Sequence, residues 1–82
     1  MSHDTRSKLV YMANQIATFF ASQPADEAVQ GVATHINKFW EPRMRRQLFE
    51  ILEEEENGLS ALVLEAAPLI RKPAAASNQI HQ

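Results

Sequence analysis

The residue types that most often perform chemistry are sparse and scattered in this sequence. Cysteine is absent, which excludes disulfides, thiolate zinc sites, iron–sulfur ligation and cysteine nucleophiles. Three histidines are present, but His3 and His81 lie near the two ends, and His35 stands alone within a helical pattern. No His-x3-His or His-Glu-x2-His spacing occurs, so no set of zinc ligands is recognisable. The only glycines are Gly31 and Gly58, too few for a phosphate-binding loop. We therefore expect no catalytic, metal-binding or cofactor-binding residues, and no enzyme activity from the chain by itself.

Four consecutive glutamates, Glu53–Glu56, form the densest group of charges. Successive side chains on a helix diverge by about 100°, so these carboxylates cannot converge on one cation. The simpler interpretation is a solvated helix end. The serines, in turn, lack a base in any recognisable arrangement for nucleophilic catalysis.

Length and composition limit the chain to a single small domain. It has 82 residues, of which 45% are hydrophobic, and a formal net charge of −2. This balance argues against a general nucleic-acid binder, which is usually strongly basic. No apolar stretch reaches the roughly 18–20 residues of a membrane helix, and the first residues lack the apolar core of a signal peptide. We expect a cytoplasmic protein that contacts neither membrane nor nucleic acid.

The elements that must position the remaining candidate residues are helices. Apolar residues recur with helical spacing throughout, and no segment alternates with period two, so the predicted fold class is all-α. We expect a small bundle of three to four short helices, formed by one helical domain over residues 1–72. A mobile, flexible C-terminal tail over residues 73–82 should follow it.

Prolines and one Asn-Gly pair mark the predicted breaks. Pro24 and Pro42 both suit a first helical position, and Asn57-Gly58 is a strong helix stop. Ser60 is suited to cap a fourth helix, which Pro68 should kink or shorten by removing a backbone donor. The first expected helix begins at about 4–7 and ends at 21. The next two cover about 24–40 and 42–55, and the fourth follows Ser60.

Each predicted helix has one apolar face that should turn inward. Gly31 lies off this face, where it either permits a close approach of another backbone or costs about 1 kcal/mol without benefit. The expected core residues are Leu9, Met12, Ala13, Ile16 and Phe20, then Ala25, Ala28, Val29, Val32 and Ile36, then Met44, Leu48, Ile51 and Leu52, and finally Leu62, Val63, Ala66, Leu69 and Ile70.

Two aromatic pairs end the first two helices. Phe19-Phe20 and Phe39-Trp40 are each adjacent in sequence, so both members of a pair cannot point inward. One member should lie at the rim, where it either covers the edge of the bundle or contacts a partner, since aromatic residues are favoured interface anchors.

Three arginines occupy the start of the third predicted helix, while the glutamates occupy its end. Both groups oppose the helix dipole, at a cost of about 0.3–1 kcal/mol for each exposed charge. This arrangement favours a partner outside the helix, although pairing with Glu41 or Asp26 is the alternative. Under the first interpretation, the arginines should be dispensable for the fold of the isolated chain. The candidate partner-binding residues are Phe39, Trp40, Arg43, Arg45, Arg46 and Phe49.

Two segments carry a resemblance to a known family. Residues 12–20 (MANQIATFF) and 31–45 (GVATHINKFWEPRMR) resemble the delta subunit of the NAD-dependent, molybdenum-containing formate dehydrogenases. The resemblance covers about residues 9–71. Its most specific part is His35-Ile36 followed by Phe39-Trp40-x-Pro42-Arg43-Met44-Arg45, and residues 59–66 add a weaker match.

The resemblance implies an accessory subunit of a cytosolic complex that interconverts formate and carbon dioxide with NAD. In that family, the alpha subunit carries the molybdenum cofactor and iron–sulfur clusters, and the beta and gamma subunits carry FMN and further clusters. The delta subunit has no redox centre and is associated with assembly or stability of the complex. The expected partner of this chain is therefore the large alpha subunit.

Two alternatives from other classes remain. A small helix-turn-helix nucleic-acid-binding protein would use the third helix for recognition, but Glu50 and Glu53–Glu56 on the same predicted helix would repel phosphates. A small helical adaptor for an unrelated partner is the other alternative.

Overall fold

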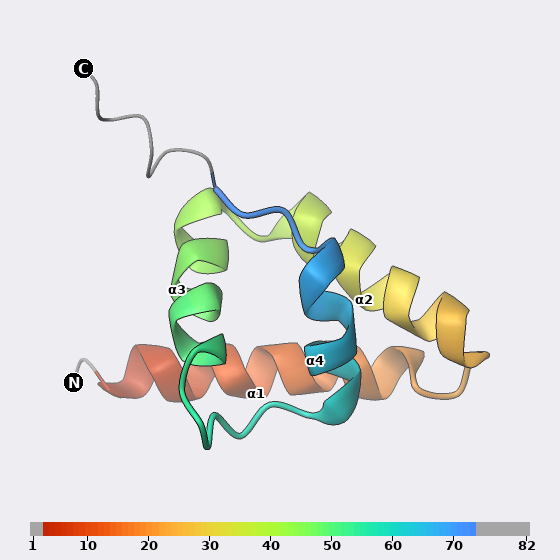
Figure 1. Ribbon diagram of the computed structural model, residues 1–82, viewed down its shortest axis with the longest axis horizontal. Coiled ribbons are helices and arrows are strands. Elements are labelled where there is room, and N and C mark those ends of the chain that lie inside the picture. Colours follow the sequence, from red (N-terminus) through yellow and green to blue (C-terminus); the bar gives the residue numbers. More distant parts are fainter. Residues whose placement is uncertain (1–2, 74–82) are drawn as a thin grey trace.

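Proline stands at the two places where one long helix ends and the next begins. The computed structural model describes residues 3–73, and Figure 1 shows that these residues form helices and turns without a strand. The predicted all-α class is confirmed. The predicted tail, 73–82, lies outside the described residues apart from Pro73. The elements are α1 (His3–Phe20), α2 (Ala25–Phe39), α3 (Pro42–Leu52), α4 (Ala61–Ala66) and the 3-10 turn η1 (Ala67–Leu69).

The third helix ends earlier than the sequence predicted. α3 stops at Leu52 rather than near Glu55, so the four glutamates form the turn after the helix and not its last turn. Carboxylates are unfavourable beside the unpaired carbonyls of a helix end. Asn57 fixes the turn instead, because its amide donates to the carbonyl of Glu54 at 3.2 Å and accepts from the N–H of Leu59 at 3.0 Å. Gly58 follows with a φ of 78°, which glycine adopts without strain.

The fourth helix is capped as predicted and is short. The hydroxyl of Ser60 accepts from the N–H of Val63 at 3.5 Å. Pro68 ends the α-helical geometry, and the chain continues as η1. The predicted inward position of Leu69 is wrong, because this residue follows the tighter 3-10 geometry and lies exposed.

The core lies where the four helices meet (Figure 1). α2 packs against α1 and α4, while α1 also contacts α3 and α4. Besides Leu69, the predicted core residue Ala25 is exposed, at the start of α2. Seven others are only half-buried against the core: Met12, Ile16, Phe20, Val29, Met44, Leu52 and Leu62. The buried residues are Leu9, Ala13, Ala17, Ala28, Val32, Ala33, Ile36, Trp40, Leu48, Ile51, Leu59, Val63, Ala66 and Ile70.

Two asparagine side chains hold the irregular segments on either side of α4. The amide of Asn14 on α1 donates to the carbonyl of Gly58 at 3.0 Å and accepts from the N–H of Ser60 at 2.8 Å. The amide of Asn37 on α2 donates to the carbonyl of Leu69 at 3.0 Å and accepts from the N–H of Arg71 at 2.7 Å. Each amide thus pairs one backbone donor and one backbone acceptor that no helix satisfies.

The close approach anticipated at Gly31 involves a side chain rather than a backbone. A Cβ atom at this position would lie 2.5 Å from Cδ1 and 2.6 Å from Cε1 of Phe20. Real Cβ atoms do not approach so closely, so the ring of Phe20 occupies space that only glycine leaves.

Replacing Asn37 with alanine should destabilise the fold by about 1–3 kcal/mol, since two hydrogen bonds worth about 0.5–1.5 kcal/mol each are lost. Urea denaturation followed by the fluorescence of Trp40, the only tryptophan, measures this change. Gln15→Ala, at an exposed position of α1, is the control and should stay within about 0.5 kcal/mol of the parent. Equal stability of the two variants would contradict the structural role of Asn37.

Candidate partner-binding surface

Trp40 belongs to the core of the chain. It follows the last residue of α2, where the backbone leaves helical geometry and its N–H donates to the carbonyl of Ile36 at 3.0 Å. The side chain is 4% exposed. Of the pair Phe39-Trp40, tryptophan is therefore the inward member and Phe39 the rim member, as the adjacency argument required. The indole presents almost no surface on which a partner could bind directly.

Arg45 is engaged within the chain. Its Nη1 donates to the carbonyl of Trp40 at 2.8 Å, and its Nε donates to the carbonyl of Arg71 at 3.0 Å. These bonds occupy Arg45 within the chain, and its contact with a group outside the chain stays a prediction. The alternative had placed the intramolecular partners on acidic side chains, whereas they are main-chain carbonyls. Arg45 links the start of α3, the end of α2 and the segment after η1.

Arg43 and Arg46 project from the first half of α3 and are exposed. Among the side chains that the structure describes, neither forms a hydrogen bond or ion pair. They remain predicted partner-binding residues, and their position leaves both guanidinium groups accessible.

Phe49 is half-buried on α3 and lines a groove between α3 and the end of α4. The ammonium of Lys72 lies 5.4 Å from the centre of its ring, a distance at which cation–π attraction operates. The groove has a volume of about 400 Å³ and also includes Leu52, Leu64 and Pro68.

Phe39 is the most exposed of the three aromatic residues among the six predicted partner-binding residues, at 64%. The ring of His35, one turn earlier on α2, packs against it with a centroid distance of 4.8 Å. The ammonium of Lys38 lies 5.8 Å from the same ring. Phe39, together with these two neighbours, lines a second groove.

We call this second groove the aromatic groove. It has a volume of about 400 Å³, and its lining residues are Phe20, Gln30, Gly31, Thr34, His35, Lys38 and Phe39. Phe19, which is 73% exposed, meets the Phe20 ring edge-on at a centroid distance of 5.0 Å. Phe20 and Gly31 were not among the predicted site residues. The helical position of Gly31, off the apolar face, was the available signal.

The structure does not gather the six predicted residues into one surface. Phe39 and Phe49 line different grooves. Trp40 and Arg45 stabilise the chain itself, and the two remaining arginines are exposed on α3.

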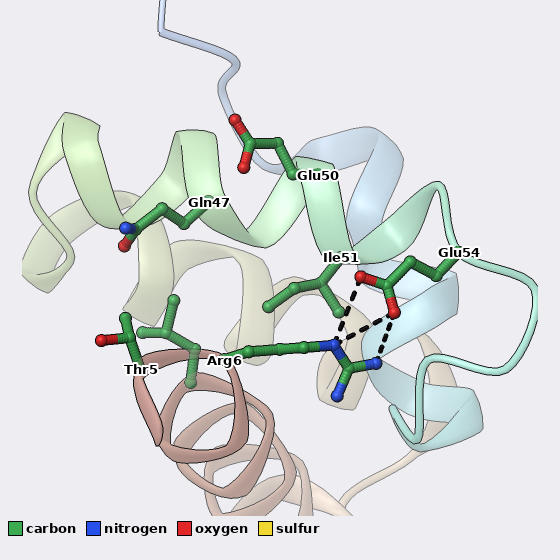
Figure 2. A pocket seen from close by; sticks show the side chains of 7 residues that line it. Thr5, Arg6, Gln47, Glu50, Ile51 and Glu54 are labelled. Atoms are coloured by element: carbon green, nitrogen blue, oxygen red, sulfur yellow. Dashed lines mark hydrogen bonds and ion pairs between the residues drawn. The ribbon is translucent and has the colours of Figure 1, made fainter. Parts of the chain in front are cut away.

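A polar cleft of about 210 Å³ between α1 and the end of α3 is shown in Figure 2. The guanidinium of Arg6 pairs across it with the carboxylate of Glu54, with Nε 3.0 and 3.2 Å from the two oxygens. The hydrogen bond from Arg6 lowers the pKa of Glu54. The two charges satisfy each other, so the cleft is explained as a contact between α1 and the turn after α3.

Over the part of the chain that the structure describes, no three His, Asp or Glu side chains lie close enough together to hold a metal ion. Within the same range, none of the helices combines the length and apolar character needed to cross a membrane.

Replacing Arg45 with alanine should lower the free energy of unfolding by about 1–3 kcal/mol, since a charged donor to two carbonyls is lost. Arg43→Ala and Arg46→Ala should each change it by less than about 0.5 kcal/mol. Urea denaturation of the three variants makes the comparison. If Arg45→Ala were as stable as the other two variants, the intramolecular contacts of Arg45 would not stabilise the fold. That result would favour the hypothesis that Arg45 serves a partner.

The Arg6–Glu54 pair should make a small, pH-dependent contribution to stability. Because folding lowers the pKa of Glu54, the unfolded chain binds more protons, and the contribution is present above the ordinary carboxyl pKa of about 4.3. It is lost as the pH falls through the lowered pKa. The stability difference between the parent and Glu54→Gln should therefore be greatest near pH 7 and vanish in acid, and 1 M NaCl should reduce it. A difference that grew on acidification would refute this.

Comparison with known proteins gives a single result. Neither the curated proteins nor the solved structures include a match to this chain. A family model does match, over residues 8–67, a range that contains both segments on which the resemblance was based. Since this match covers most of the 82 residues, the chain belongs to the family of the NADH-dependent formate dehydrogenase delta subunit, FdsD.

Proposed function

We propose that this chain is a non-catalytic accessory subunit that supports assembly or stability of the molybdenum-containing catalytic subunit of formate dehydrogenase. The observation that carries this proposal is the exposure of Phe39 and Phe19 on a chain whose core is already complete. Exposed apolar side chains grouped around a groove are typical of protein–protein contact surfaces. Membership of the delta-subunit family indicates the complex in which the contact would be made.

The proposed partner is the large alpha subunit, within a cytoplasmic complex that also contains beta and gamma subunits. In this proposal, the molybdenum cofactor, iron–sulfur clusters, FMN and NAD all bind to the other subunits. The delta chain contributes contact surface only. Binding to the folded form of a partner stabilises that form by mass action, which is the simplest way for a small helical subunit to raise the yield of a large enzyme.

The nucleic-acid alternative receives less support from the arrangement of α3. Of the three arginines that suggested a recognition helix, Arg45 is bound to the main chain at both ends of its guanidinium. The remaining two share the helix with Glu50, whose charge opposes phosphate binding.

The proposal predicts that omission of the delta chain reduces the amount of enzyme and not its chemistry. The other subunits should be expressed with and without it, and the assembled complex, its molybdenum content and its formate oxidation measured. Without the delta chain, assembled complex or molybdenum per alpha subunit should fall several-fold, while activity per bound molybdenum stays within about twofold.

Two results would contradict this. Equal assembly, molybdenum content and stability without the delta chain would remove the accessory role. A large loss of activity per bound molybdenum would instead give the delta chain a part in turnover.

A further inference from the structure

We infer that the aromatic groove is the docking site, and that it receives an amphipathic segment of the partner carrying a carboxylate next to a large apolar side chain. The inference rests on the proposed function, because it takes the partner to be another subunit of the complex. It differs from the sequence-based hypothesis, which placed the contact on six residues between Phe39 and Phe49; of these, only Phe39 lines the aromatic groove.

The shape of the groove favours an apolar side chain. The ring of Phe20 lies directly against Gly31, which has no side chain. At this position the wall of the groove is therefore formed by an aromatic ring. Phe39 lies two helical turns further along α2 than Gly31, and the ring of His35 packs against its ring. Both aromatic residues belong to helices that pack on the core, so the groove is largely preformed and little ordering is needed for binding.

The charge of the groove favours a carboxylate. The chain has ten acidic and eight basic residues, yet none of the residues that line the groove is acidic. The ionisable side chains there are Lys38 and His35. The ammonium of Lys38 lies beside the Phe39 ring, so a carboxylate that approaches it would sit next to an apolar contact. An apolar anchor with an adjacent opposite charge is a common arrangement in specific interfaces.

A second copy of this chain fits the groove less well. A symmetric dimer places the same surface of each copy against the other, and with Lys38 near the two-fold axis it would bring the two Lys38 side chains together. Like charges at such a contact oppose association. The partner segment of opposite charge is therefore the occupant that we test.

The test uses the full delta chain and the formate dehydrogenase complex purified from cells that lack it. Phe39→Ala should weaken binding at least tenfold, and Thr34→Trp, which fills the groove from an exposed position, should do the same without removing an aromatic side chain. Lys38→Glu should weaken binding more than Lys38→Gln. Binding is measured by biolayer interferometry at 50 and 300 mM NaCl, and circular dichroism confirms that each variant is folded.

Matched controls are available on the same fold. Tyr11→Ala removes an aromatic side chain from α1 that is exposed to the same 64% as Phe39, and Lys8→Glu reverses an exposed charge on that helix. Both should bind within twofold of the parent. A photo-crosslinking residue at position 39 should in addition trap a segment of another subunit with carboxylates beside apolar residues.

The outcomes separate this inference from the proposed function. If the parent chain does not bind the complex at all, the proposed function itself fails. If the parent binds and the groove variants bind equally well, the complex uses another surface, and only the docking inference is overturned. Crosslinking to a basic segment, or to a second delta chain, would overturn it as well.

Discussion

The fold depends on side-chain groups that satisfy the backbone of segments too irregular to satisfy themselves. α4 has six residues, too few to persist as an isolated helix, and the segments before and after it lack helical hydrogen bonds. Asn14 pairs with the segment before it, Asn37 with the segment after it, and Arg45 with the end of that second segment. These groups hold the segments that flank α4, whose residues Val63 and Ala66 are fully buried in the core.

The side chains at the end of α2 and the start of α3 divide between roles inside the chain and positions at its surface. Arg45 lies between Arg43 and Arg46 in the same short stretch of α3, yet it is directed to main-chain carbonyls while the other two are exposed. Likewise, Trp40 completes the core and Phe39, its neighbour, stands at the edge of the aromatic groove. Arg45 and Trp40 therefore stabilise the chain itself. Arg43, Arg46 and Phe39 remain exposed and determine the charge and apolar character of the surface.

Much of the fold could be predicted, because proline positions and apolar periodicity are local signals. α2 differs from its predicted span by one residue at each end. The end of α3 could not be placed, because it depends on Asn57 and on the pairing of Glu54 with α1. The direction of Trp40 was also unpredictable, since the backbone there is extended, with φ −90° and ψ 131°, and helical periodicity no longer applies. The hydrogen bonds of Asn14 and Asn37 join residues more than 30 positions apart, and no local sequence pattern predicts them.

The contact between Gly31 and Phe20 implies a conflict between stability and surface shape. Glycine within a helix costs about 1 kcal/mol relative to alanine, so selection for helix stability alone would replace it. Alanine, however, would bring its Cβ atom against the Phe20 ring, so this ring, which lines the aromatic groove, would have to shift. The shape of that groove thus depends on a residue that weakens its own helix, and a substitution that strengthened the helix at this position would alter the wall of the groove.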